Sequence, residues 1–133
     1  MPHNLVILKP GSLEEVGMLA EASATAADAA TRQFVPRSDK VLLASKLLQT
    51  RETQQLAFTA PSEPGIYPYV CTYPGHWRRM YGALYVVADL DAYLANPEAQ
   101  ERFVLQSLDR PLRHRLYERV DGLLGKFQLK QAR

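Results

Sequence analysis

The sequence predicts a mainly β fold, a sandwich or a barrel, that also contains helical segments. Several short runs rich in strand-forming residues are separated by proline and glycine turn signals, as is typical of such folds. An alanine-rich helical stretch interrupts these runs, and the pattern becomes helical again from residue 89 onward. With 133 residues, 47% hydrophobic and 23% charged, the chain has the size and composition of one globular domain.

The predicted strands alternate with turns. The strand-like stretches are residues 2–9, 41–48, 53–59, 66–71 and 81–88. The first is closed by the turn pair Pro10-Gly11, and residues 61–65 form a turn cluster of proline, serine and glycine. In the third, Leu56 and Phe58 alternate with more polar neighbours, the pattern of a half-buried strand.

Two helical regions are predicted. Ser12 and Glu15 have the spacing of a capping box, and the alanine-rich helix that they begin extends to about Arg32. Near the C-terminus, Asn96-Pro97 starts a helix over residues 97–109, and a second follows over 111–124. We therefore expect a domain at residues 1–88 and a helical extension at residues 89–133.

Composition argues against several classes of protein. The formal net charge is only +2, and the basic residues are interspersed with acidic ones, so a nucleic-acid surface is not predicted. The sequence contains no apolar stretch of the roughly 18 to 20 residues that a membrane span needs. Its first residues do not form a secretory signal.

The segment from Cys71 to Met80 predicts a metal site. It places a thiol, the imidazole of His76 and a thioether within ten residues, on a loop between two predicted strands. A lone cysteine is usually a small buried apolar residue, but thiolate, imidazole and thioether together favour copper. A second imidazole comes from His3 or His114, and His3 is preferred because it opens a strand-like run. A nucleophilic cysteine–histidine pair would leave the methionine and the second histidine unexplained.

These residues resemble those of a known family. The pair His3-Asn4, with the segment Cys71-Thr72-Tyr73-Pro74-Gly75-His76 and Met80, is similar to the azurin branch of the cupredoxins over residues 2–88. The resemblance implies a cupredoxin-like Greek-key β-sandwich in which residues 12–32 are a helical insertion. It implies one copper ion in a type 1 (blue) site, with His3, Cys71, His76 and Met80 as its ligands.

The resemblance also implies roles for neighbouring residues. Asn4 would steady the ligand loop by hydrogen bonding near Cys71, with Thr72 beside it. The carbonyl group of Pro2 would approach the metal as a weak fifth contact, although azurins carry glycine there. The exposed edge of His76 would be the electron port, and the residues around it would be Pro74, Gly75 and Trp77.

The function that the resemblance implies is single-electron transfer, not enzymatic catalysis. We expect a carrier in a bacterial redox chain or a module of a larger oxidoreductase, with a c-type cytochrome or a dehydrogenase as its partner. A periplasmic or other extracytoplasmic location is implied. The alternative is a module for copper storage, delivery or sensing, or an incomplete domain without redox cycling.

The predicted strands are fewer than a complete sandwich of this family needs. We therefore expect a sequence truncated at its N-terminus, or a fragment of a longer protein. We also expect the apolar faces of helices 97–109 and 111–124 to cover the sheet that the missing strands would leave open.

Overall fold

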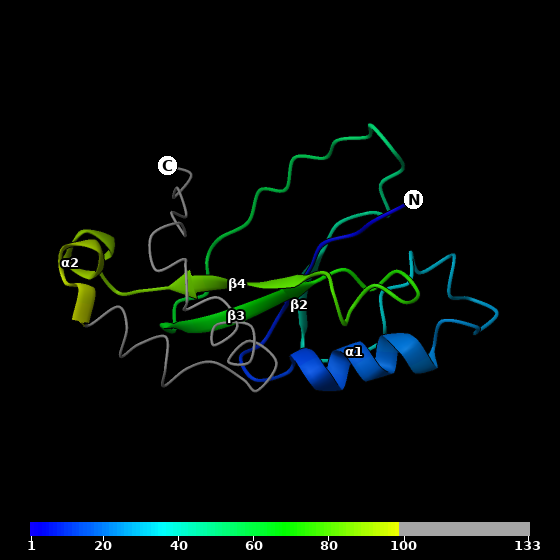
Figure 1. Ribbon diagram of the computed structural model, residues 1–133, viewed down its shortest axis with the longest axis horizontal. Helices are drawn as coiled ribbons and strands as arrows, with labels where there is room; N and C mark the ends of the chain where they lie inside the picture. The colour runs from blue at the N-terminus through cyan, green and yellow to red at the C-terminus, as the bar shows by residue number, and fades with distance from the viewer. Residues whose placement is uncertain (99–133) are drawn as a thin grey trace.

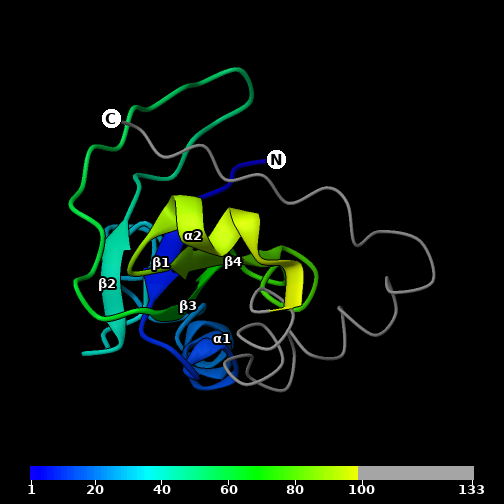
Figure 2. The ribbon, with the colours of Figure 1, turned by 90° about the vertical axis from the view of Figure 1, so that its left-hand side faces the viewer.

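The computed structural model describes residues 1–98, in which the strands form a single sheet. Its elements are β1 (Val6–Leu8), α1 (Leu13–Ala22), β2 (Val41–Ala44), β3 (Gly65–Val70), β4 (Tyr81–Val86) and α2 (Leu90–Ala95). The four strands are antiparallel and follow the order β2-β1-β3-β4 (Figures 1 and 2). The prediction of a mainly β, cupredoxin-like fold with small helices is confirmed.

The sheet has an apolar cluster on each face. On one face, Val6 and Leu8 of β1 are fully buried with Leu13 and Val16 of α1. On the other face, the centre of the cluster is Ile7, Tyr67 and Val86. Figures 1 and 2 show α1 against one side of the sheet and the long connection from β2 to β3 arching on the other. The residues predicted to bind a metal lie just before β1 and in the connection from β3 to β4.

The strand predicted over residues 53–59 is wrong. Residues 53–60 have no regular secondary structure and, apart from the half-buried Leu56, are exposed. An alternating pattern forms a strand only where a sheet edge pairs with it. Residues 53–60 pair with neither edge strand of this sheet, β2 or β4. The other four predicted strands are present; three are shorter than predicted, and β3 has the predicted length but begins one residue earlier.

Helix α1 is shorter than predicted, because it ends at Ala22 and not near Arg32. Half of residues 23–32 are alanines, whose small side chains offer little apolar surface to bury, so propensity alone does not keep this segment helical. Its residues form turns, tied by an ion pair between Arg32 and Asp28 at 2.9 Å. The predicted capping box is also wrong, because the Ser12 hydroxyl donates to the carbonyl of Lys9 at 2.6 Å and caps nothing in α1.

After β4 the chain turns into α2, a short helix at the start of the predicted helical extension, before the two helices whose bounds were predicted. The carboxylate of Asp89 caps it by accepting from the backbone N–H of Ala92 at 2.9 Å. Residues 97 and 98 are helical, where the helix 97–109 was predicted to begin. The rest of that prediction, the helix 111–124 and the covering of the sheet lie outside the described residues. Within residues 1–98, every helix is too short or too polar to cross a membrane.

Candidate metal centre

Three segments far apart in the sequence bring two imidazoles and one thiol together. His3 precedes β1 and is held by two backbone hydrogen bonds with Leu48, of 2.9 and 2.8 Å. Cys71 directly follows β3, and His76 lies in the turn after it. The Sγ atom of Cys71 lies 3.9 Å from Nδ1 of His3 and 3.5 Å from Nδ1 of His76. All three candidate ligand atoms lie within 4.8 Å of one another.

These separations fit one shared metal ion. A first-row ion bound at about 2.0 Å to nitrogen and 2.3 Å to sulfur separates those two atoms by about 3.5 to 3.7 Å in tetrahedral or trigonal geometry. Both distances in the cluster lie within a few tenths of an ångström of that range. The donors are soft, one thiol and two imidazoles, which favours copper over the hard cations that prefer oxygen. The residues present therefore fit a copper ion.

The ligand loop is a tight turn closed by backbone hydrogen bonds. The N–H of His76 donates to the carbonyl of Tyr73 at 3.0 Å, and the N–H of Cys71 donates to the carbonyl of Met80 at 2.9 Å. Gly75 has a φ of 81°, a left-handed conformation that glycine adopts without steric cost. This turn returns the backbone of Met80 to Cys71, as the spacing of the motif predicts, and leaves the side chain of Met80 38% exposed.

The surroundings of the cluster favour the neutral, metal-binding form of His76. Cys71 is 4% exposed and unpaired, so its thiol is available to a metal. Burial lowers the pKa of His76, and the nearby His3 lowers it further. A lowered pKa keeps this imidazole neutral near pH 7, and only a neutral imidazole has a lone pair for a metal.

Asn4 connects both sides of the centre. Its Oδ1 accepts from the backbone N–H of Thr72 at 2.8 Å, and its Nδ2 donates to the Thr72 hydroxyl at 2.9 Å. The same Nδ2 donates to the carbonyl of Gln33 at 2.9 Å. Asn4 and Thr72 are both buried, so these bonds are shielded from water. They fix the residue after His3 to the residue after Cys71.

Two residues near the centre were not anticipated from the sequence. Gln33 and Phe34 have φ values of 57° and 60°, which are uncommon for residues other than glycine. This conformation places the ring of Phe34 edge-on to Tyr73, with centroids 5.2 Å apart, and Tyr73 lies 5.0 Å from the ring of His76. No local motif marks these positions, because the contacts join residues almost forty positions apart.

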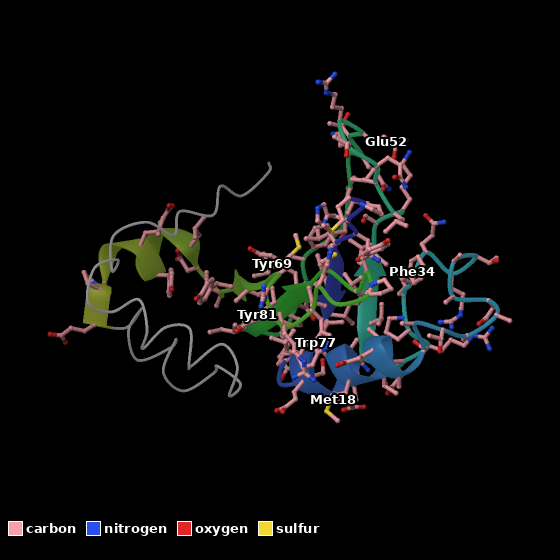
Figure 3. All side chains as sticks on the ribbon, turned by 45° about the vertical axis from the view of Figure 1, so that its right-hand side comes forward. Met18, Phe34, Glu52, Tyr69, Trp77 and Tyr81 are labelled. Atoms are coloured by element: carbon pink, nitrogen blue, oxygen red, sulfur yellow. The ribbon has the colours of Figure 1, made fainter. Side chains whose placement is uncertain are left out.

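The prediction that Trp77 lines the electron port is wrong. Its side chain is only 6% exposed and belongs to the apolar cluster beneath α1. Figure 3 shows Trp77 beside this helix, and its Nε1 donates to Glu21 at 3.0 Å. In this turn His76 joins the donor cluster, whereas the indole of the next residue enters the core. Arg78 covers its ring at 4.3 Å and also donates to Glu21.

The carboxylate of Glu21 predicts a pH effect on stability. Hydrogen bonds from Trp77 and then Arg78 lower its pKa below the ordinary value of 4.5, so its stabilising contribution is complete above that pH. The contribution is lost as the pH falls through the lower pKa of the folded state. We expect the difference in urea midpoint between wild type and Glu21→Gln to shrink toward zero in that acidic range. Fluorescence of the single tryptophan monitors this unfolding, and a difference that stays constant down to pH 2 would contradict the expectation.

The other port residues lie at the surface beside His76. Gly75 is exposed and Pro74 is half-buried. The sulfur of Met1 lies 2.9 Å from Nε2 of His76, on the side of the ring away from Cys71. The approach of the Pro2 carbonyl to a metal stays a prediction.

The fold and this donor cluster define a small β protein with one soft-metal site. Over residues 1–87, the sequence matches the family described as copper binding proteins, plastocyanin/azurin family. That match covers more than half of the chain, and the chain belongs to this family. Family and cluster together assign one type 1 copper site to it.

Individual relatives agree with this assignment. Auracyanin-A of Chloroflexus aurantiacus is 38% identical over 85 residues, which are 63% of this chain and 50% of that protein. The reduced auracyanin of Roseiflexus castenholzii has a TM-score of 0.54 at 31% identity, over 65% of this chain and 67% of that one. An azurin of Methylomonas sp. strain J has a TM-score of 0.54 at 26% identity, over 65% of this chain and 66% of that one. The chain thus spans half the length of the curated relative.

Proposed function

We propose that this chain carries single electrons through a copper ion bound by Nδ1 of His3, Sγ of Cys71 and Nδ1 of His76. The observation that carries the proposal is the convergence of these three atoms, within 4.8 Å of one another, on a largely buried thiol. Bound copper supplies the one-electron change between Cu(I) and Cu(II) in such a site. The thioether of Met80 would contribute a fourth, weak ligand, because the backbone of Met80 is hydrogen-bonded to that of Cys71.

The protein contributes rigidity to this function. A site that exchanges electrons quickly must hold its ligands nearly still in both oxidation states. His3 is fixed through its backbone to Leu48, Cys71 to Met80, and Asn4 bridges the two ligand segments through Thr72. These bonds hold the donor atoms close together before any metal arrives.

Electrons enter and leave, in this proposal, by the edge of His76 that faces away from Cys71. Gly75 and Pro74 lie beside this edge at the surface and contribute no charge. A small and largely apolar contact suits a redox partner that must dissociate quickly. A c-type cytochrome or a dehydrogenase, outside the cytoplasm, is the partner that we propose.

We also propose that the copper domain ends near residue 88 and that residues 89–133 form a separate extension. In support, β4 ends at Val86 and the family match ends at residue 87.

The test is a titration of the metal-free chain with Cu(II). We expect one equivalent to produce an intense blue thiolate charge-transfer band, which ascorbate bleaches and ferricyanide restores. His76→Ala is expected to lose the band, whereas His114→Ala, a histidine outside the described residues, keeps it. A colourless protein that binds only Cu(I) would indicate copper storage or delivery and would contradict electron transfer.

A further inference from the structure

The candidate metal-binding loop contains a side chain, that of Trp77, which packs in the core on the side away from the donor cluster. His76 and Trp77 are consecutive, yet the imidazole of His76 joins the donor cluster while the indole enters the core. The indole packs with α1, an element that supplies none of the assigned copper ligands. A displacement of this indole would therefore move the histidine attached to it.

Gly17 of α1 makes the closest contact with this indole. A Cβ atom at Gly17 would overlap the ring atoms Cε3 and Cδ2 of Trp77, at separations that real Cβ atoms essentially never show. Glycine inside a helix is normally unfavourable and indicates a packing reason when it occurs. Here the reason is the indole, which lies almost directly on the helix backbone.

Polar contacts fix the remaining freedom of the ring. Glu21 lies one helical turn after Gly17, and its Oε2 accepts from Nε1 of Trp77 at 3.0 Å. The same oxygen accepts from Arg78 at 3.0 Å, and the guanidinium of Arg78 lies 4.3 Å from the indole centroid. The indole is thus held from several directions. We refer to the set Gly17, Glu21, Trp77 and Arg78 as the Trp77 lock.

The Trp77 lock is joined to two of the assigned ligands. The carbonyl of His76 accepts from the N–H groups of Arg79 and Met80, at 2.9 Å each, so residues 76 to 80 form one closed turn. Because the turn is closed, the position of residue 77 on α1 determines where His76 and Met80 stand relative to Cys71.

We propose that the Trp77 lock is a positioning device, which fixes the copper-ligand loop on α1 and thereby sets the geometry of the copper site. Trp77 and Gly17 act through His76 and Met80 and do not touch the metal. This inference rests on the proposed function, because it assigns a role within the same site. It also gives α1 a purpose beyond covering the sheet.

The test introduces the missing Cβ. Gly17→Ala, in the full chain loaded with copper, is expected to shift the visible band and the copper EPR hyperfine splitting. Electron self-exchange, measured by NMR line broadening, is expected to slow by about tenfold or more, since displacements of a few tenths of an ångström to 1 Å matter at such sites. Met18→Ala is the matched control, because Met18 is the next residue of α1 and is 55% exposed. It is expected to leave all three measurements unchanged.

A rescue separates positioning from general loss of stability. The double variant Gly17→Ala/Trp77→Phe has a smaller ring opposite the new methyl group and is expected to return the spectrum to that of Trp77→Phe alone. If Gly17→Ala does not fold, the same measurements are made on Glu21→Ala, which removes the hydrogen-bond acceptor of the indole Nε1 and introduces no clash.

The outcomes are distinguishable from failure of the proposed function. If the wild-type chain gives no blue band, electron transfer is wrong. Suppose instead that the wild type is blue and that Gly17→Ala and Glu21→Ala both have the same spectrum and self-exchange rate as the wild type. The Trp77 lock then has no positioning role, and the inference is overturned.

Discussion

Replacing Cys71 with serine is expected to abolish the blue band completely. The band requires a thiolate bound to Cu(II), and Cys71 is the only cysteine in the chain. A serine hydroxyl is a hard donor that remains protonated near neutral pH, so it replaces neither the charge nor the softness of the thiolate. The remaining imidazoles of His3 and His76 could still hold Cu(II), but only as a pale complex.

The measurement is a visible spectrum after Cu(II) addition, together with an unfolding curve of the metal-free variant. Cys71 is buried beside Thr72, and serine is nearly the same size, so we expect the variant to fold. Met80→Leu is the matched comparison, because the loss of a weak axial ligand is expected to retain the blue band and change the reduction potential. A Cys71→Ser protein that is still intensely blue would show that the thiolate is not the source of the band.

The metal site was more predictable than the fold around it. The spacing of Cys71, His76 and Met80 is local, and chemistry restricts which residues can bind copper, so sequence alone indicated the loop. His3 was less secure from the residues alone, because its approach to Cys71 depends on the pairing of β1 with β3. The structure brings its Nδ1 to 3.9 Å from the thiol.

Predictions failed where contacts between distant segments decided the outcome. Local pattern predicts a strand at residues 53–59 and a helix that extends to Arg32. Residues 53–60 pair with no strand of the sheet, and the residues after Ala22 form turns. Trp77 was assigned to the surface because it follows a surface histidine, whereas the space beside Gly17 places it in the core. The glycine inside α1 was the available local signal of that contact.

Asn4→Ala is expected to lower the free energy of unfolding of the metal-free chain by about 3 kcal/mol, because buried polar groups left without partners cost about 1 to 3 kcal/mol each. The substitution removes the acceptor for the Thr72 N–H and the donor to the Thr72 hydroxyl. Both groups belong to Thr72, which is only 2% exposed, so water does not readily replace the lost Asn4 side chain.

The same substitution releases the backbone of Gln33. Its carbonyl accepts from Asn4 at 2.9 Å, and its left-handed conformation is held partly by that bond. The side chain of Gln33 also accepts from the N–H of Leu47, in the segment that pairs with His3. Asn4→Ala is therefore expected to loosen the site as well as to destabilise the fold, and so to weaken copper binding.

Urea unfolding of the metal-free protein measures the first effect, since bound copper would add its own stabilisation. The exposed Asn96 provides the matched control, and Asn96→Ala is expected to cost well under half as much. A double-mutant cycle with Thr72→Val isolates the side-chain pair, and its coupling is expected to be favourable because the two side chains are in contact. Equal losses for Asn4→Ala and Asn96→Ala would mean that the buried bridge contributes little. The rigidity of the site would then have to come from the backbone pairing of its ligand segments.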